Sequence, residues 1–307
     1  MKKIVVIVGP TAVGKTALSI KLAQKFNGEI VSGDSMQIYR NLDIGTAKAT
    51  VAEQLEVPHH LINIADPDEN YSAAKFVTAA QKAITDISER GKLPILVGGT
   101  GFYVQALLGD RPLAKTSDID DPEFVQHWTE IAHRDGEQVV RDALKEVDAV
   151  SEARILPGQI RRLVRALLVS TQTGQPFSSL QPEPKRQYDA FIIGLKTERS
   201  LLYERINQRV DDMMMSGVLA EAELVYHLPA ESTAKRAIGY KELFGYLTGD
   251  ESYAEAVMRL KQASRRYAKR QMTWFNNQFQ DIRWFDLVQQ PDELDQIMDQ
   301  LNNFMLE

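Results

Sequence analysis

The sequence of 307 residues contains no cysteine. This absence excludes disulfide bonds, thiolate nucleophiles, iron–sulfur clusters and cysteine-ligated zinc sites. The sequence also lacks any run of about eighteen apolar residues, so a membrane-spanning helix is not expected. The apolar run Ile4–Val8 stops at Gly9-Pro10 without the small-residue cleavage pattern of a signal peptide, so it predicts a first strand. We therefore expect a cytoplasmic protein without a membrane partner, and we expect it to be a monomer.

A strong positive charge is also missing, since the net charge is −6. Nucleic-acid binders often carry a net positive charge, so the total argues mildly against such a partner, although binding depends on where the charges lie. Charged residues make up 25% and hydrophobic residues 44% of the chain, which are ordinary values for a folded protein. A chain of this length is predicted to form one large domain with a smaller inserted or appended domain.

Short apolar segments alternate with helical patterns in the first third of the chain. Strands buried on both faces are predicted at Ile4–Val8, Glu29–Ser32 and Leu93–Val97, with helices over Thr16–Phe26 and from Ser72 to about Arg90. Alternation of strands and helices favours a parallel sheet with helices on both faces. The fold class expected is therefore α/β, with a doubly wound parallel sheet.

The middle of the chain has a different character, because residues 113–188 contain helical patterns and no buried-strand run. A strand pattern returns at Phe191–Leu195, helices dominate residues 201–279, and Ile282–Phe285 is a candidate late strand before a last helix over Gln289–Met305. The simplest organisation is a core domain of residues 1–112 and 189–307, interrupted by a helical insertion domain of residues 113–188.

A phosphate-binding loop follows the first strand. The segment fits the pattern G-x-x-x-x-G-K-[ST] at every fixed position, and it reads Gly9-Pro10-Thr11-Ala12-Val13-Gly14-Lys15-Thr16. Glycines let the backbone wrap around phosphate oxygens, the helix N-terminus adds partial positive charge, and Lys15 adds a full one. The Thr16 hydroxyl is placed to bind Mg²⁺. The pattern makes the core P-loop NTPase-like, but an ATPase, a kinase and a diphosphate-ester transferase need the same loop.

Two polar residues follow the second and third predicted strands, at the sheet edge where open α/β sheets bind ligands. Asp34 could remove a proton from a nucleophile, or it could cap the next turn or hold Mg²⁺ through water. Thr100 could donate to the bridging oxygen of a departing diphosphate, or it could serve as the N-cap of the following helix, and its flanking glycines would let a substrate approach closely. The residues alone leave both alternatives open.

Five segments, in order, resemble the motifs of the bacterial tRNA dimethylallyltransferases, the IPP transferase family. They are Gly-Pro-Thr-Ala-Val-Gly-Lys-Thr (9–16), Ser-Gly-Asp-Ser-Met-Gln-Ile-Tyr-Arg (32–40), Val-Gly-Gly-Thr-Gly-Phe-Tyr (97–103), Arg-Ala-Ile-Gly-Tyr-Lys-Glu (236–242) and Tyr-Ala-Lys-Arg-Gln-Met-Thr-Trp-Phe (267–275). The resemblance implies transfer of dimethylallyl from dimethylallyl diphosphate to N6 of the adenosine just 3′ of the anticodon, position 37 of tRNA, with release of diphosphate. It implies that this adenosine is flipped out, because a stacked base cannot reach a buried diphosphate.

The resemblance also implies roles for individual residues. The P-loop residues 9–16 would hold the donor's diphosphate, Asp34 would be the base at N6, Thr100 would contact the leaving diphosphate, and Arg209 together with Lys15 would complete the catalytic set. One departure concerns the insertion, where the basic residues of the family pattern are present but its acidic residues are not. Individual contacts of the insertion with tRNA are therefore less firmly implied than the activity.

Two basic clusters could contact RNA despite the acidic total. One is Arg161, Arg162 and Arg165, and the other lies on a predicted helix that contains Lys261, Arg265, Arg266, Lys269 and Arg270. Each cluster alone would be expected to be a solvated helix face. Motifs and clusters together place the predicted tRNA contacts at Asp34, Ser35, Met36, Gln37, Thr100, Gln159, Arg161, Arg162, Arg165, Arg236, Gly239, Tyr240, Lys241, Lys269, Arg270 and Trp274.

Three hypotheses follow for the function. The first is a tRNA dimethylallyltransferase that uses Mg²⁺. The second is a small-molecule P-loop kinase or NTPase, for which Asp34 would hold Mg²⁺ or orient water. The third is a non-catalytic RNA-binding P-loop protein. A metal site at His59-His60 is not expected, because adjacent side chains diverge on most backbones and no third ligand is evident.

Overall fold

The computed structural model describes residues 1–114, 116 and 119–307. Within them the chain separates into two compact units, residues 1–110 with 186–307 and residues 111–185. The smaller unit therefore begins and ends within three residues of the helical insertion indicated by the sequence. Along the described residues, no helix combines the length and apolar character needed to cross a membrane.

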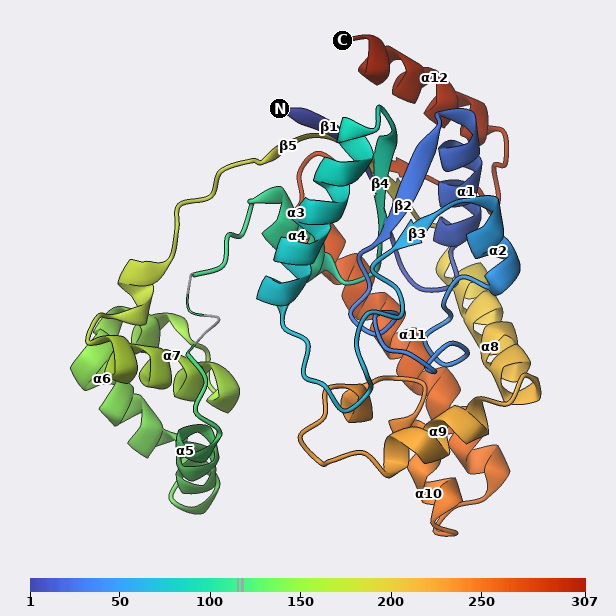
Figure 1. The fold of residues 1–307 in the computed structure, drawn as a ribbon. Coiled ribbons are helices and arrows are strands. Elements are labelled where there is room, and N and C mark those ends of the chain that lie inside the picture. The colour runs from blue at the N-terminus through green and yellow to red at the C-terminus, as the bar shows by residue number, and fades with distance from the viewer. Residues whose placement is uncertain (115, 117–118) are drawn as a thin grey trace. The chain divides into compact units, whose positions relative to one another are not determined.

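The larger unit contains a six-stranded sheet in the order β3-β2-β4-β1-β5-β6, and every neighbouring pair is parallel (Figure 1). The strands are β1 (Lys2–Val8), β2 (Gly28–Ser32), β3 (His59–His60), β4 (Leu93–Val97), β5 (Tyr188–Leu195) and β6 (Arg283–Phe285). The expected doubly wound α/β fold is confirmed. The short edge strand β3 was not predicted from the sequence, because two residues carry no periodicity.

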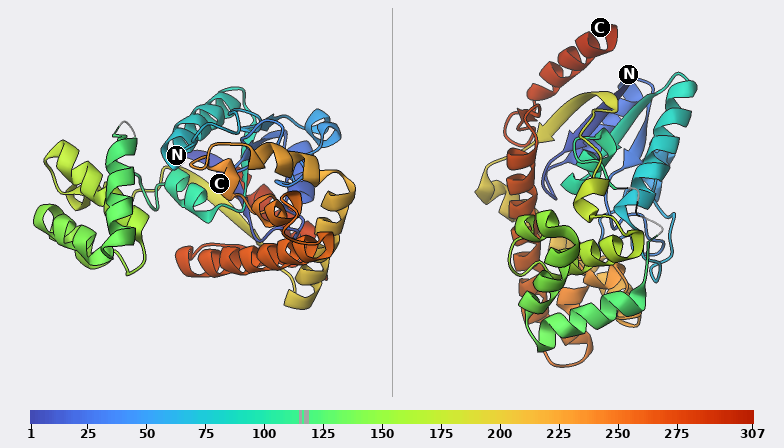
Figure 2. Two further views of the ribbon diagram at one scale, coloured as in Figure 1. Left: turned by 90° about the horizontal axis from the view of Figure 1, so that it is seen from below. Right: turned by 90° about the vertical axis from the view of Figure 1, so that its left-hand side faces the viewer.

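Helices cover both faces of this sheet, as the views in Figures 1 and 2 show. One face packs against α1 (Lys15–Lys25), α8 (Arg199–Met215) and α12 (Glu293–Leu306), and the other against α3 (Ala73–Glu89) and α4 (Gly101–Leu108). The central strand β1 shows why, since Val5 and Ile7 belong to one apolar core while Ile4, Val6 and Val8 belong to the other. Alternate side chains of a strand point to opposite faces, so a strand covered on both faces needs an unbroken apolar run.

The remaining helices of the larger unit gather at the carboxyl ends of the strands (Figure 1). They are α2 (Val51–Glu56), α9 (Val218–Tyr226), α10 (Phe244–Leu247) and the long α11 (Tyr253–Gln278), with the 3₁₀ turns Ala234–Arg236 and Lys241–Leu243. A third apolar core joins α9, α10 and α11 to the segment that follows β2, through Ile38, Tyr39 and Leu42. These helices therefore support the segment after β2 from the side away from the sheet.

The smaller unit is helical and has a core of its own. It contains α5 (Pro122–Arg134), α6 (Glu137–Arg154), α7 (Ile160–Thr173) and a 3₁₀ turn at Phe177–Leu180. Its buried residues include Val140, Leu144 and Leu163. Asp148 interrupts the helical backbone of α6, and its carboxylate accepts hydrogen bonds from the N–H and hydroxyl groups of Ser151 and Ser178.

Candidate active site

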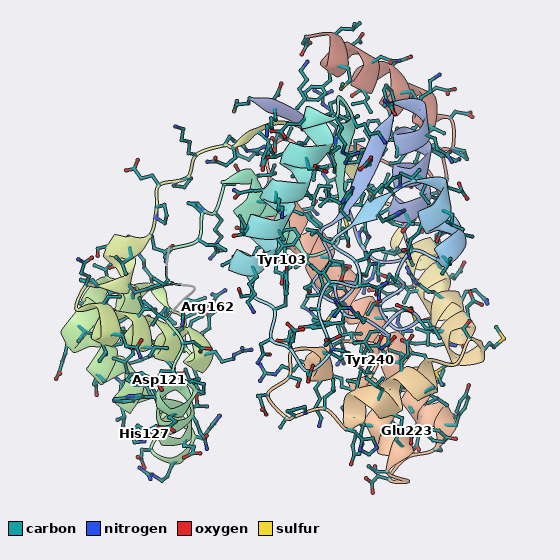
Figure 3. The ribbon with its side chains drawn as sticks, in the orientation of Figure 1. Tyr103, Asp121, His127, Arg162, Glu223 and Tyr240 are labelled. Atoms are coloured by element: carbon teal, nitrogen blue, oxygen red, sulfur yellow. The ribbon has the colours of Figure 1, made fainter. Side chains whose placement is uncertain are left out.

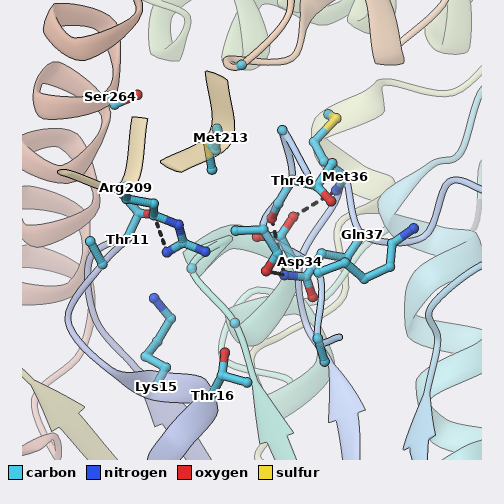
Figure 4. Close-up of a pocket in the computed structure, with 18 of the residues that line it drawn as sticks. Thr11, Lys15, Thr16, Asp34, Met36, Gln37, Thr46, Arg209, Met213 and Ser264 are labelled. Atoms are coloured by element: carbon cyan, nitrogen blue, oxygen red, sulfur yellow. Dashed lines mark hydrogen bonds between the residues drawn. The ribbon is translucent and has the colours of Figure 1, made fainter. Parts of the chain in front are cut away.

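A cavity of about 810 Å³ opens in the larger unit at the carboxyl ends of β1, β2 and β4 (Figure 4). The P-loop, the segment after β2 and the loop after β4 line it on the sheet side, and α8 and α11 contribute from the helical side. Open parallel sheets bind ligands at this edge, beside the strand where the chain order reverses, which here is β1. The cavity therefore brings together Lys15, Arg209 and residues of the P-loop and of the segment after β2 that the sequence singled out, whereas Thr100 and the basic residues of α7 do not line it.

The P-loop connects β1 to α1 and has the backbone of a phosphate cradle. Gly9 has a φ of +141°, and a Cβ at this position would lie 2.5 Å from the carbonyl oxygen of Leu195, so the loop can run this close to β5 only with glycine. The ammonium of Lys15 donates to the carbonyl oxygens of Gly9 (3.0 Å) and Pro10 (2.7 Å), across the mouth of the loop. Thr16 also lines the cavity, in agreement with the predicted cradle.

Two cations face this cradle. Burial, together with the nearby charge of Arg209, lowers the pKa of Lys15 to about 7, although the charge of Asp34 acts in the opposite direction. Arg209 comes from α8 and donates to the hydroxyl of Thr11 (3.4 Å), and burial lowers its pKa as well. A guanidinium stays protonated over the whole physiological range, so Arg209 remains a fixed charge. Two buried cations in contact with one loop form a site for an anion, because an anion removes both their repulsion and their desolvation cost.

Asp34 lies after β2 on the opposite side of the cavity (Figure 4). Its Oδ1 accepts a hydrogen bond from the backbone N–H of Met36 (2.8 Å), so the turn-capping interpretation from the sequence is correct for this oxygen. Burial raises the pKa of Asp34, and the Met36 N–H and the charges of Lys15 and Arg209 act in the other direction. A carboxylate that burial makes more basic can accept a proton, so capping and proton abstraction are compatible here.

Thr100 stands at the N-cap position of α4, but its hydroxyl makes no capping hydrogen bond. The interpretation as an ordinary N-cap is therefore wrong for the side chain. Its Oγ1 instead accepts the backbone N–H of Ser35 (3.2 Å), next to Asp34 in the chain. Tyr267 of α11 lines the cavity, and burial together with the charge of Asp34 raises the pKa of Tyr267, so its phenol keeps its proton. Tyr267 was not singled out from the sequence.

Close contact between two backbones brings Asp34 and Thr100 together. A Cβ on Gly98 would lie 2.4 Å from the carbonyl oxygen of Gly33. Moving side chains could not relieve this clash, because the atoms in contact belong to the backbone. The N–H of Gly33 also donates to the carbonyl oxygen of Val97 (2.7 Å). The two glycines therefore allow the ends of β2 and β4 to approach, so that Thr100 reaches Ser35, which lines the cavity beside Asp34.

The segment after β2 is held in place by hydrogen bonds on both sides. The Gln37 amide accepts from the Ser32 hydroxyl (2.9 Å) and donates to the carbonyl oxygens of Thr46 (3.3 Å) and Ala47 (3.1 Å). The carboxylate of Glu221, on α9, accepts from the consecutive N–H groups of residues 43–45. We call residues 34–48 the recognition loop.

Tyr240 supports the recognition loop from below. Its side chain is fully buried, and its hydroxyl donates to Glu221 (2.8 Å; Tyr240 is labelled in Figure 3). A Cβ on Gly45 would lie 2.4 Å from the Tyr240 ring, and a Cβ on Gly239 would lie 2.9 Å from the Gly45 carbonyl oxygen. Of the neighbouring predicted tRNA contacts, Arg236 lines the cavity and Lys241 is exposed. The geometry thus gives Gly239 and Tyr240 an indirect task, which is to shape the loop.

The basic residues of α11 separate into two groups. Lys261 pairs with Asp211 (2.6 Å) and Arg265 donates to Asn207 (2.5 Å), so both are tied to α8. Arg266, Lys269 and Arg270 are exposed on the same helix. Trp274 is half-buried and packs against Gly101. The face available to a polyanion is therefore narrower than helical spacing alone suggested.

The basic cluster of the smaller unit also divides. Arg161 and Arg162 are exposed on α7, and Arg162 donates to the side-chain oxygen of Gln159 (2.7 Å; Arg162 is labelled in Figure 3). Arg165 is turned inward, because its guanidinium donates to the carbonyl oxygens of Thr116 and Ile119. Arg165 therefore stabilises the connection at the start of the smaller unit.

Known proteins share this sequence and fold. The family model described as IPP transferase matches residues 37–278. The chain belongs to the IPP transferase family. A tRNA dimethylallyltransferase of Levilactobacillus brevis is 52% identical over 100% of this chain and 99% of the relative, and one of Limosilactobacillus fermentum is 49% identical over 99% of both. The resemblance inferred from the five motifs is thus confirmed.

Solved structures of the family agree with the fold. The tRNA isopentenylpyrophosphate transferase of Bacillus halodurans superimposes with a TM-score of 0.73 at 43% identity, covering 99% of this chain and 97% of that one. A eukaryotic dimethylallyltransferase acting on tRNA gives a TM-score of 0.84 at 31% identity, covering 100% of this chain and 80% of that one. Similarity at this level extends over the core and the insertion, so the IPP transferase fold accounts for the entire chain.

The state of Lys15 makes anion binding depend on pH. With a pKa of about 7 in the free protein, Lys15 is mostly neutral at pH 8, and a bound diphosphate should restore its proton. We expect binding of inorganic diphosphate at pH 8 to take up close to one more proton in the wild type than in Lys15→Arg, whose charge does not titrate. Calorimetry in buffers of different ionisation enthalpy measures this uptake. Equal uptake by both proteins would contradict the assignment.

The backbone contact between β2 and β4 makes a second prediction. Gly98→Ala should lower the free energy of unfolding by about 1–3 kcal/mol, because the added methyl meets backbone atoms. Gly33→Ala is the matched control, since its methyl would lie 3.3 Å from the movable end of Leu96 and should cost less. Urea denaturation of both variants provides the comparison. Equal losses would show that the strand ends have room to separate.

Proposed function

We propose that this protein transfers a dimethylallyl group from dimethylallyl diphosphate to N6 of the adenosine 3′ of the anticodon, position 37 of tRNA. The observation that carries the proposal is the arrangement of one cavity. A diphosphate cradle with the cations Lys15 and Arg209 shares the cavity with a carboxylate of raised basicity, Asp34. The Thr100 hydroxyl, which makes no capping bond, contacts Ser35 at the cavity wall. The chain belongs to the IPP transferase family, and its relatives are named tRNA dimethylallyltransferases, which supports the same reaction.

In the proposed reaction, the C–N bond between N6 and the first carbon of the dimethylallyl group forms as the bond from that carbon to the diphosphate oxygen breaks. The proton of the amine goes to Asp34, and the electron pair of the broken bond leaves with the diphosphate. Lys15 and Arg209 stabilise the growing negative charge of the leaving group, as preorganised cations do in phosphoryl chemistry. The Thr100 hydroxyl donates to the bridging oxygen.

Mg²⁺ suits the cradle, although the acidic and histidine residues that the structure describes form no three-ligand cluster. A P-loop would need no such cluster, because one threonine hydroxyl, the ligand's own phosphate oxygens and water could supply the oxygen ligands that Mg²⁺ prefers. We assign Thr16 as the protein ligand, since it lines the cavity beside Lys15. The ion would neutralise charge on the departing diphosphate.

For tRNA we propose contacts with the flipped adenosine from Asp34, Ser35 and Met36, with Gln37 fixing the loop that carries them. The exposed cations of each unit would bind phosphates of the anticodon stem and loop. They are Arg161 and Arg162 on α7, Arg266, Lys269 and Arg270 on α11, and Arg236 and Lys241 between α9 and α11. An RNA loop with splayed bases is the form of RNA that such a site can read.

A transfer assay tests the reaction directly. Labelled dimethylallyl diphosphate, Mg²⁺ and unmodified tRNA should give labelled tRNA and free diphosphate. Asp34→Asn and Thr100→Ala should each lower kcat by about 100-fold or more, as loss of general-base or leaving-group assistance does, while tRNA affinity changes little. Asp68→Asn, at an exposed aspartate outside the cavity, serves as the control.

The alternatives give different results in the same assay. ATP turnover without label in RNA would favour a kinase or NTPase, and RNA binding without turnover would favour a binding protein. If Asp34→Asn or Thr100→Ala lost affinity for tRNA and kcat in equal proportion, the catalytic roles would be refuted.

The division of the α11 cations gives a test of the RNA surface. Changing Lys269 and Arg270 to glutamine should weaken tRNA binding and reduce the slope of log affinity against log salt by about two, one for each phosphate that the variant no longer neutralises. Lys261→Gln is the matched control, because its ammonium already pairs with Asp211 and should leave the slope almost unchanged. Filter binding over a range of salt concentrations measures both. An unchanged slope in the double variant would show that this face is merely solvated.

A further inference from the structure

The glycines on both sides of Thr100 face α11. A Cβ on Gly99 would lie 2.1 Å from the side-chain nitrogen of Gln271, and a Cβ on Gly101 would lie 2.2 Å from the indole ring of Trp274. The sequence suggested that these glycines let a substrate approach. The structure shows instead that the space beside them is filled by two side chains one turn apart on α11.

Gln271 uses both ends of its amide to join two loops of the active site. Its Oε1 accepts the backbone N–H of Thr11 in the P-loop (2.9 Å), and its Nε2 donates to the carbonyl oxygen of Gly99 (3.1 Å). The side chain is 5% exposed, so water does not compete for these bonds. An amide is planar and rigid, and one that is bound at both ends fixes the separation of its two partners.

This bridge connects the loops that follow β1 and β4, just beyond the last hydrogen bond between the two strands. The N–H of Gly98 donates to the carbonyl oxygen of Ile7 (3.1 Å), which links β4 to β1 where both strands end. One residue further along the β4 loop, the side chain of Gln271 connects Gly99 to Thr11 of the P-loop. One side of the bridge is the diphosphate cradle, and the other is the residue immediately before Thr100.

We infer that Gln271 is a positioning residue that sets the distance between the diphosphate cradle and the Thr100 hydroxyl. The inference rests on the proposed function, in which one donor molecule must touch both groups as its C–O bond breaks. Gln271 touches neither substrate in this role. Misplacement of a reacting group by about 1 Å can cost about 100-fold in rate, so a fixed separation has a large effect on kcat.

The test compares two buried glutamines. Gln271→Met keeps the size of the side chain and removes both hydrogen bonds, and we expect kcat to fall about 10- to 100-fold while KM for tRNA stays within about threefold. Gln105→Met is the matched control, because Gln105 is also 5% exposed and its Nε2 also donates to a backbone carbonyl, that of Gln278 (3.0 Å), away from the cavity. Gln105→Met removes one hydrogen bond and a buried oxygen that has no partner, so it should lower thermal stability less than Gln271→Met, and only Gln271→Met should lose kcat.

Gly99→Ala provides a second, independent variant. Its methyl would displace the amide of Gln271, so this change should reproduce the loss of kcat. Because both changes break one bridge, the double variant Gly99→Ala/Gln271→Met should be no slower than the slower single variant. Losses that multiply in the double variant would overturn the inference, as would a Gln271→Met enzyme with the kcat of the Gln105→Met control.

Hydrogen exchange supplies a measurement that does not depend on catalysis. Gln271→Met should speed exchange of the Thr11 amide proton at least tenfold relative to Gln105→Met, because that proton loses its acceptor. An unchanged Thr11 exchange rate would overturn the bridge itself, whether or not the enzyme transfers dimethylallyl. Absence of transfer in the wild type would instead refute the proposed function, so the two failures are distinguishable.

Discussion

The active site depends on how closely two parallel strands approach where they end. Parallel strands lie nearly 5 Å apart, and side chains normally keep the loops that follow them from coming closer. Gly33 and Gly98 remove that restriction, and their backbones meet almost in van der Waals contact. Asp34 and Thr100 follow these glycines, and the Ser35 N–H then reaches the Thr100 hydroxyl. The proposed base and the proposed leaving-group donor come from distant parts of the sequence, and the sheet places them near each other.

The electrostatics of the cavity are unfavourable until an anion is present. Burial makes the charged forms of Lys15, Arg209 and Asp34 all costly, and the attraction of Asp34 for the two cations recovers only part of that cost. Charges held ready in this way need no rearrangement when negative charge develops on a leaving group. The same burial keeps Asp34 more basic than a solvated carboxylate. Desolvation therefore serves anion binding and proton abstraction together.

Local patterns were sufficient to predict some of these features from the sequence, and long-range contacts hid the rest. The P-loop could be predicted because its eight residues contain the turn, the charge and the helix start. The contact of the Thr100 hydroxyl could not be predicted, because a threonine before a helix is equally able to cap that helix or to contact a distant residue such as Ser35. Helical spacing placed Lys261 on the basic face of α11. Its ion pair with Asp211 on α8, which the spacing does not reveal, means that its charge is already neutralised. Gln271 had no signal of its own, since its two partners are 260 and 172 residues away.

The recognition loop shows where selectivity would come from in such a site. The side-chain amide of Gln37 already bonds to Ser32, Thr46 and Ala47. It therefore stabilises the loop and is not available to form hydrogen bonds with base edges. Glu221 holds the following residues by three N–H groups, and Tyr240 holds Glu221. A loop fixed in this way loses little conformational entropy when a ligand binds. An adenine would then be selected by the shape of a preformed pocket and by Asp34, and the exposed cations would supply affinity without reading the sequence.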